Sequence, residues 1–103
     1  MFIAMNRFQV TLGREGDFEE LWLNRDSHLK GVPGFIEFSL LKGPEREDHR
    51  LYSSHSIWAS HKAFESWTKS DAFKKAHQGA KPSPFMYIGS PKFEGFEVLQ
   101  KLS

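Results

Sequence analysis

The chain has 103 residues, a formal net charge of +1 and no cysteine. This length predicts a single domain over residues 1–103, and the balanced charge argues against a strongly basic nucleic-acid-binding protein. The lack of cysteine excludes disulfides, thiolate metal sites and a cysteine nucleophile. There is no apolar run of transmembrane length and no signal-peptide pattern, so we expect a soluble cytoplasmic protein without a membrane partner.

Aromatic side chains are unusually frequent. Phe, Trp and Tyr make up 15% of the residues, although all hydrophobic residues together reach only 39%. Such a composition favours a dimer interface or a pocket for a large flat ligand. An ordinary aromatic core is the alternative.

The first half of the chain predicts a strand, a helix and a second strand. Apolar residues alternate over residues 2–12, which is typical of a strand. Asp17 begins a capping-box pattern that opens a helix, and the Gly- and Pro-containing run 31–34 ends it. Residues 35–42 alternate again, and a charged, hairpin-like connection follows them.

The second half predicts a third strand, two helical segments and a last strand. Residues 50–58 form the third strand. Ser60 and Ser70 stand at N-cap positions, each ahead of a helical stripe of apolar residues. The Gly- and Pro-rich segment 79–92 predicts a long mobile loop, and residues 93–100 the last strand.

The resulting order, β-α-β-β-α-β, predicts an α+β fold of the ferredoxin-like type. Its helices would cover one face of a four-stranded sheet and leave the other face open. A monomer rarely leaves a large apolar face exposed to water, so we expect a homodimer joined sheet to sheet. The residues expected on the open face are Met5, Phe35, Leu41, Tyr52 and Trp58.

Asn6 is the unusual residue of the first strand. Counting by two from Phe2 places it on the face assigned to the helices. A buried amide without partners costs about 1–3 kcal/mol. Either backbone groups at a bulge satisfy Asn6, or its amide projects into an apolar cavity as a hydrogen-bond donor.

Three histidines are candidate ligands. His77 follows Phe73 by four residues at the end of a helix, which suits a ligand at a pocket mouth and equally an ordinary helix end. The other two candidates are His28, in the last turn of the first helix, and His55, in the third strand. His55 could equally be a core histidine whose ring nitrogens have hydrogen-bond partners. No zinc-binding helix, phosphate-binding loop or nucleophile elbow is present.

Three segments resemble the IsdG-type haem-degrading monooxygenases, and within them the HmuQ/HmuD variety. They are AMNRFQV in the first strand, GVPGF at 31–35 and SIWASHKAFESWTKSDAFKKAH at 56–77. The last is the most specific, because it combines a strand-end Trp, a W-x-K-S-D-x-F turn and a His ten residues after the second Trp. Its S-x-x-x-F-x-x-W portion alone would indicate only the wider antibiotic-biosynthesis monooxygenase superfamily.

The resemblance implies a dimeric α+β barrel and a catalytic, haem-binding set of Asn6, Trp67 and His77. His77 would be the axial iron ligand, because imidazole can supply one bond to haem iron. Trp67 would press on the porphyrin and ruffle it, and Asn6 would form hydrogen bonds on the oxygen side. Haem would be both cofactor and substrate. O₂ and an external reductant, supplied by an electron-donating reductase, would open the ring at a meso carbon and release iron.

Other functions remain open at this stage. One is a cofactor-independent monooxygenase acting on a quinol-like aromatic. Others are a haem-binding storage or transfer protein and a structural barrel with no active site. The product of ring opening is also open, since relatives yield either biliverdin with CO or an oxo-bilin with formaldehyde.

Overall fold

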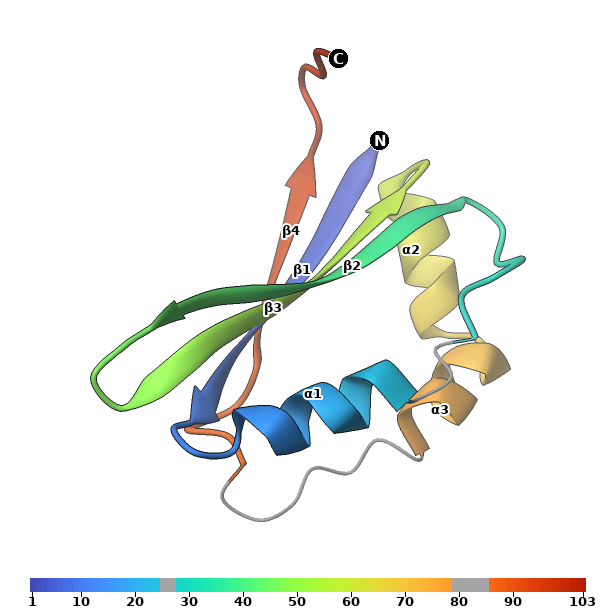
Figure 1. Cartoon of the computed structure of the whole chain (residues 1–103). Coiled ribbons are helices and arrows are strands. Elements are labelled where there is room, and N and C mark those ends of the chain that lie inside the picture. The colour runs from blue at the N-terminus through green and yellow to red at the C-terminus, as the bar shows by residue number, and fades with distance from the viewer. Residues whose placement is uncertain (25–27, 79–85) are drawn as a thin grey trace.

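The computed structural model describes residues 1–24, 28–78 and 86–103, with the backbone alone at 77 and 78. Within these residues the predicted order of elements is confirmed, with the second helix divided in two (Figure 1). The elements are β1 (Phe2–Thr11), α1 (Glu15–Asn24), β2 (Phe35–Glu45), β3 (His49–Trp58), α2 (His61–Thr68), α3 (Asp71–Gln78) and β4 (Lys92–Glu97).

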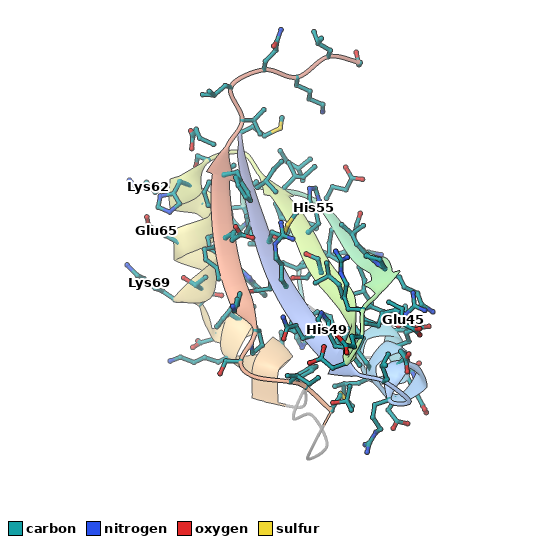
Figure 2. All side chains as sticks on the ribbon, turned by 90° about the vertical axis from the view of Figure 1, so that its left-hand side faces the viewer. Glu45, His49, His55, Lys62, Glu65 and Lys69 are labelled. Carbon is teal, nitrogen blue, oxygen red and sulfur yellow. The ribbon has the colours of Figure 1, made fainter. Side chains whose placement is uncertain are left out.

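The strands form one antiparallel sheet in the order β2-β3-β1-β4. This is the ferredoxin-like arrangement, and the predicted α+β class is confirmed. All three helices lie on one side of the sheet (Figure 1). Figure 2 looks onto the opposite, uncovered face, with His55 on it and the helices behind the sheet.

Serine caps start both short helices, as predicted. The Ser60 hydroxyl accepts a hydrogen bond from the Ala63 amide at 3.1 Å, and the Ser70 hydroxyl accepts one from the Phe73 amide at 3.2 Å. Each hydroxyl satisfies an amide that has no partner within its own helix. The break between the helices therefore follows from the sequence at Ser70.

The prediction for the start of α1 was wrong by three residues. The helix begins at Glu15 and not after Asp17, and the Glu15 carboxylate accepts a hydrogen bond from the Gly13 amide at 2.7 Å. Gly13 itself has φ +91°, the left-handed conformation that a glycine adopts readily. The turn and the first acidic residue together set the helix start.

Three of the five residues expected on the open face lie on the helix face instead. Trp58 and Tyr52 pair with Phe2 and Phe8 of β1, which are buried beneath the helices. Side chains directly opposite in a sheet share a face, so Tyr52 and Trp58 face the helices too, as does Phe35, which pairs with Trp58. Met5 and Leu41 occupy the open face, as predicted, because they pair with His55 and Ser53.

A bulge in β2 explains the position of Phe35. Its pairing partner is Trp58, and the next pair along is Glu37 with Ile57, so Ile36 is an extra residue in β2. One extra residue reverses the alternation. Phe35 and Phe38 therefore share the helix face, although strict alternation would put them on opposite faces.

The C-terminal part of the predicted loop is tied to β1. The Thr11 amide donates to the Met86 carbonyl and the Ile88 amide to the Gln9 carbonyl, each at 2.8 Å, and Met86 is only 2% exposed. The prediction of a mobile loop was wrong for this part, and residues 79–85 lie outside the described residues. β4 ends at Glu97, earlier than predicted.

The helix face of the sheet carries two core clusters with a gap between them. On β1, Phe2 and Ala4 belong to the first cluster, whereas Phe8 and Val10 belong to the second. Asn6 stands between the two clusters on the same face of β1. The buried members of the first are Phe2, Ala4, Leu29, Trp58, Trp67 and Ala76, and those of the second are Phe8, Val10, Phe18, Tyr52 and Met86.

No helix within the described ranges combines the length and the apolar character needed to cross a membrane.

Candidate functional site

A cavity of about 350 Å³ lies at the gap between the two core clusters, between the sheet and the helices. Its volume is within the range of small-molecule and cofactor pockets, about 300–1,000 Å³. Its described lining is mostly aromatic, with a few polar groups. The lining residues are Ala4, Asn6, Trp22, Leu29, Phe38, Ser54, Ser56, Trp58, Phe64, Trp67, Thr68, Phe73 and Phe93.

Flat aromatic pairs form two sides of the cavity. Trp22 of α1 stacks on Phe38 of β2, with ring centroids 6.5 Å apart and planes inclined by 6°. Phe64 of α2 stacks on Phe93 of β4, at 5.5 Å and 7°. Such walls favour a flat, largely apolar ligand, because ring faces contact another extended ring over a large area.

Trp67 is at once a core residue and a lining residue of the cavity. It is 6% exposed and contacts Trp58, with centroids 6.2 Å apart and planes inclined by 29°. Phe73 also meets the Trp67 ring, edge to face, at 5.5 Å and 85°. Residues of β3 and α3 thus hold the Trp67 ring, and in a tightly packed interior such a ring moves little.

Asn6 lines the same cavity, and the structure brings it and Trp67 together. The β1–β3 pairing is regular from Phe2↔Trp58 to Thr11↔His49, so the bulge that could have satisfied Asn6 is absent from this pairing. In the described part of the chain no side-chain hydrogen bond involves its amide. Asn6 therefore offers two N–H donors and a carbonyl acceptor to the cavity.

His77 belongs to the last turn of α3, but its side chain lies outside the described residues. Phe73, four residues earlier in the same helix, lines the cavity. Neither competing histidine is among the described lining residues: His55 lies on the open face of the sheet (Figure 2), and His28 follows the end of α1 with φ +55°.

The sequence interpretation missed several lining residues. Ser54 pairs with Asn6 across β1 and β3, and Phe93 pairs with Asn6 from β4. The parity of β3 alone could not indicate Ser54, because only the register with β1 shows that Ser54 shares the face of Asn6. Trp22 and Phe38 gave no signal either, because their positions depend on the bulge and on the docking of α1.

A polar network outside the cavity lining anchors α1 to the strands. The Tyr52 hydroxyl donates to the Glu19 carboxylate, and Lys42 Nζ lies 2.9 Å from the same carboxylate. The Tyr52 hydrogen bond and then Lys42 lower the pKa of Glu19 below its ordinary value. Burial, and then the hydrogen bond to Glu19, raise the pKa of Tyr52. This network fixes the helix that carries Trp22.

A family model described as antibiotic biosynthesis monooxygenase matches residues 1–79. The chain belongs to the antibiotic biosynthesis monooxygenase family. The match extends from β1 to α3, and every described lining residue except Phe93 falls within it.

Within this family, the similarity to haem-degrading relatives that the sequence motifs indicated is confirmed. Heme oxygenase (staphylobilin-producing) 1 of Staphylococcus aureus is 34% identical over 77 residues, which cover 75% of this chain and 71% of that protein. The structure of the heme-degrader MhuD from Mycobacterium tuberculosis, with two hemes bound in its active site, matches with a TM-score of 0.77. It is 27% identical and covers all of both chains.

An oxygenase described as cofactor-independent shares the fold. SnoaB, a cofactor-independent oxygenase from Streptomyces nogalater, superimposes with a TM-score of 0.69, at 23% identity, covering 98% of this chain and 95% of that one. At this identity the match concerns the fold alone.

Proposed function

We propose that the protein is a haem-degrading monooxygenase that binds haem in the aromatic cavity as both substrate and cofactor. It opens the porphyrin at a meso carbon with O₂ and electrons from a separate reductase in the cytoplasm, and it releases iron. The observation that carries the proposal is the juxtaposition of Asn6 and Trp67 in a cavity with flat aromatic walls, in a family member that is 34% identical to a heme oxygenase.

The residues of the cavity fit a porphyrin. The stacked pairs Trp22–Phe38 and Phe64–Phe93 offer flat apolar faces, and such faces exclude water from an extended ring. Asn6 supplies an amide with no partner in the described chain. The bound iron would supply the activation of O₂.

Each proposed catalytic residue has a separate task. Asn6 donates a hydrogen bond on the oxygen side of the ring, where negative charge grows during the reaction. Trp67 presses on the macrocycle and distorts it, because Trp58 and Phe73 hold its ring in place. A ring nitrogen of His77 would bind the haem iron. Its place four residues after the lining residue Phe73 supports this role.

We propose that two copies associate through the uncovered sheet face. Apolar side chains lie there on each strand, including Met5, Leu41, Ile57 and Phe96. Leu41 is 42% exposed and Phe96 45% exposed. Exposure of these apolar side chains to water is unfavourable, and association with a second copy would bury them. Sedimentation at micromolar concentration should give about twice 11.9 kDa, and a clean monomer would contradict the dimer.

Titration with hemin separates the candidate functions. The proposed enzyme develops a Soret band that disappears when ascorbate is added in air. A storage or transfer protein would keep the band, and a cofactor-independent monooxygenase or a structural barrel would not develop one. Mass spectrometry of the product then distinguishes biliverdin from an oxo-bilin.

A further inference from the structure

Among the described residues, four with polar side chains line the cavity, and two of these side chains already have protein partners. The Ser56 hydroxyl accepts from Trp58 Nε1 at 3.0 Å and donates to the Ala4 carbonyl at 3.4 Å. The Thr68 hydroxyl donates to the Glu65 carbonyl at 2.7 Å. Both hydroxyls therefore already form hydrogen bonds with other groups of the protein.

The other two, Asn6 and Ser54, have no side-chain hydrogen bond within the described chain. Ser54 is only 8% exposed as a residue, but its hydroxyl is not one of the fully enclosed polar atoms that lack a partner in the described chain, so it remains accessible. Its hydroxyl lines the cavity beside an otherwise aromatic wall. The Ser54 hydroxyl is therefore a polar group of the cavity wall that forms no hydrogen bond within the described chain.

Ser54 and Asn6 are direct cross-strand partners on the same face of the sheet. The Cβ atoms of such partners lie about 4.5–5.5 Å apart, so one small molecule can reach both side chains. An amide and a hydroxyl can both donate to the same oxygen atom. Elsewhere the described cavity wall offers mainly ring faces, which suit the macrocycle and not a small polar molecule.

We infer that Ser54 is a second hydrogen-bond donor of the site and that it acts with Asn6 on the same oxygen co-substrate. The inference rests on the proposed haem-degrading function. Two donors aimed at one oxygen stabilise developing negative charge more than one donor does. Ser54 would thereby affect the rate of ring opening and leave the binding of the macrocycle almost unchanged.

The variants Ser54→Thr and Ser54→Val test the inference. Their side chains have nearly the same shape, and only threonine keeps the hydroxyl. Both are expected to bind hemin with affinities equal within about twofold, while the valine variant degrades it at least about tenfold more slowly than the threonine variant. The carbon monoxide complex of the reduced, hemin-loaded protein gives a second readout. Its C–O stretch should lie at a higher frequency in the valine variant, because a donor is missing.

Ser53→Ala is the matched control. Ser53 is the neighbouring residue, almost as buried as Ser54, but it pairs with Arg7 and Leu41 on the opposite face of the sheet. It should degrade hemin at the wild-type rate, whereas Ser54→Ala should resemble the valine variant. The two alanine variants decide the question even if β-branched residues at position 54 prevent folding.

The combined variant Asn6→Ala/Ser54→Ala tests the shared target. Groups that act on one atom are not independent, so the double variant should lose less rate than the product of the two single losses. Equal rates and equal C–O stretches for the threonine and valine variants would overturn the inference alone. A wild-type protein that develops no Soret band with hemin would overturn the proposed function, and the Ser54 inference with it.

Discussion

Trp67 and Phe73 meet edge to face across the break between α2 and α3, with ring centroids 5.5 Å apart and planes at 85°. The break itself is short: Lys69 and Ser70 separate the helices, and Ser70 caps the second one. The contact therefore links the helix that carries Trp67 to the helix that carries His77. A substitution of Trp67 should therefore affect both the stability of the fold and the rate of the reaction.

Replacing Trp67 should separate these two effects. Trp67→Ala removes a buried indole and should lower the free energy of unfolding by about 3–5 kcal/mol. The folded fraction should still bind haem, but in a flatter form with most turnover lost. Trp67→Phe keeps a flat ring and should retain part of both stability and activity. Thermal melting and haem loss measured on the same samples check this, and a folded alanine variant with wild-type turnover would rule out the distortion role.

Asn6→Ala should leave the fold intact. The amide makes no side-chain hydrogen bond in the described chain, so its removal leaves no polar partner of the described residues unsatisfied. The variant is expected to bind hemin with the wild-type spectrum and to degrade it roughly 10²–10³-fold more slowly, the usual effect of losing one donor to developing charge. Absorbance after addition of ascorbate measures the rate. Full activity would assign Asn6 a purely structural role.

The axial ligand can be identified with two alanine variants. His77→Ala should change the hemin spectrum and stop turnover. His55→Ala should change neither, because His55 lies on the uncovered face, away from the cavity (Figure 2). Electron paramagnetic resonance of the ferric complexes reports the ligand directly. An unchanged spectrum for His77→Ala with an altered one for His55→Ala would reverse the assignment.

Gly34 is expected to be essential for the packing of α2 against the segment that precedes β2. Its φ is +83°, and a Cβ placed on it would overlap the methyl group of Ala63 in α2. Gly34→Ala should therefore combine backbone strain with overpacking and lower the free energy of unfolding by about 2–4 kcal/mol. Because the same helix carries Trp67, the affinity for hemin should also fall.

The control for this variant is Gly13→Ala. Gly13 also has positive φ, +91°, but a Cβ there would meet no atom within 4 Å. It should show only the cost of strain, about 1–2 kcal/mol, with unchanged hemin affinity. Chemical denaturation and hemin titration of both variants measure the two effects, and equal losses would show that contact with α2 is unimportant.

Tyr52→Phe should make stability less dependent on pH. The lowered pKa of Glu19 means that its contribution is present above its ordinary value of 4.5 and is lost as the pH falls below it. The raised pKa of Tyr52 means that its contribution is complete below its ordinary value of 10.0 and is lost at higher pH. The free energy of unfolding of the wild type should therefore exceed that of the variant most between these two pH values. The difference should be about 1 kcal/mol, because Glu19 is partly solvated. Unfolding measured at pH 4, 7 and 10.5 tests the profile.

The sequence predicted the faces of β1 well and those of β3 poorly, for a physical reason. In the second half of β1 the polar Arg7 and Gln9 alternate with Phe8 and Val10, so only the parity of Phe8 and Val10 can be buried there. In β3 both parities are apolar, since Leu51 and Ile57 alternate with Tyr52 and Trp58. Only the pairing with β1 decides which set faces the helices, and pairing is a tertiary property.

The site was predictable to a similar degree. The motif around Trp67 and the odd polar residue Asn6 indicated two lining residues on elements far apart in sequence, and the structure brings them into one cavity. Ser54 could not be singled out from the sequence, because its neighbours Ser53 and Ser56 are chemically alike. Strand parity separates Ser54 from Ser53 only, and Ser56 lies on the same face and lines the same cavity. The face on which Phe38 lies depends on the bulge in β2, and no residue type in the sequence indicates that bulge.

That bulge has a consequence for how this strand can change length. Loss of Ile36 would leave Phe35 opposite Trp58 and Phe38 opposite Ser56, the pairings that they already have. A residue lost from the regular stretch between Phe38 and Lys42 would instead exchange the two surfaces of the strand on one side of the deletion. Among related chains, one-residue insertions and deletions in β2 should therefore collect at its irregular positions and spare its middle.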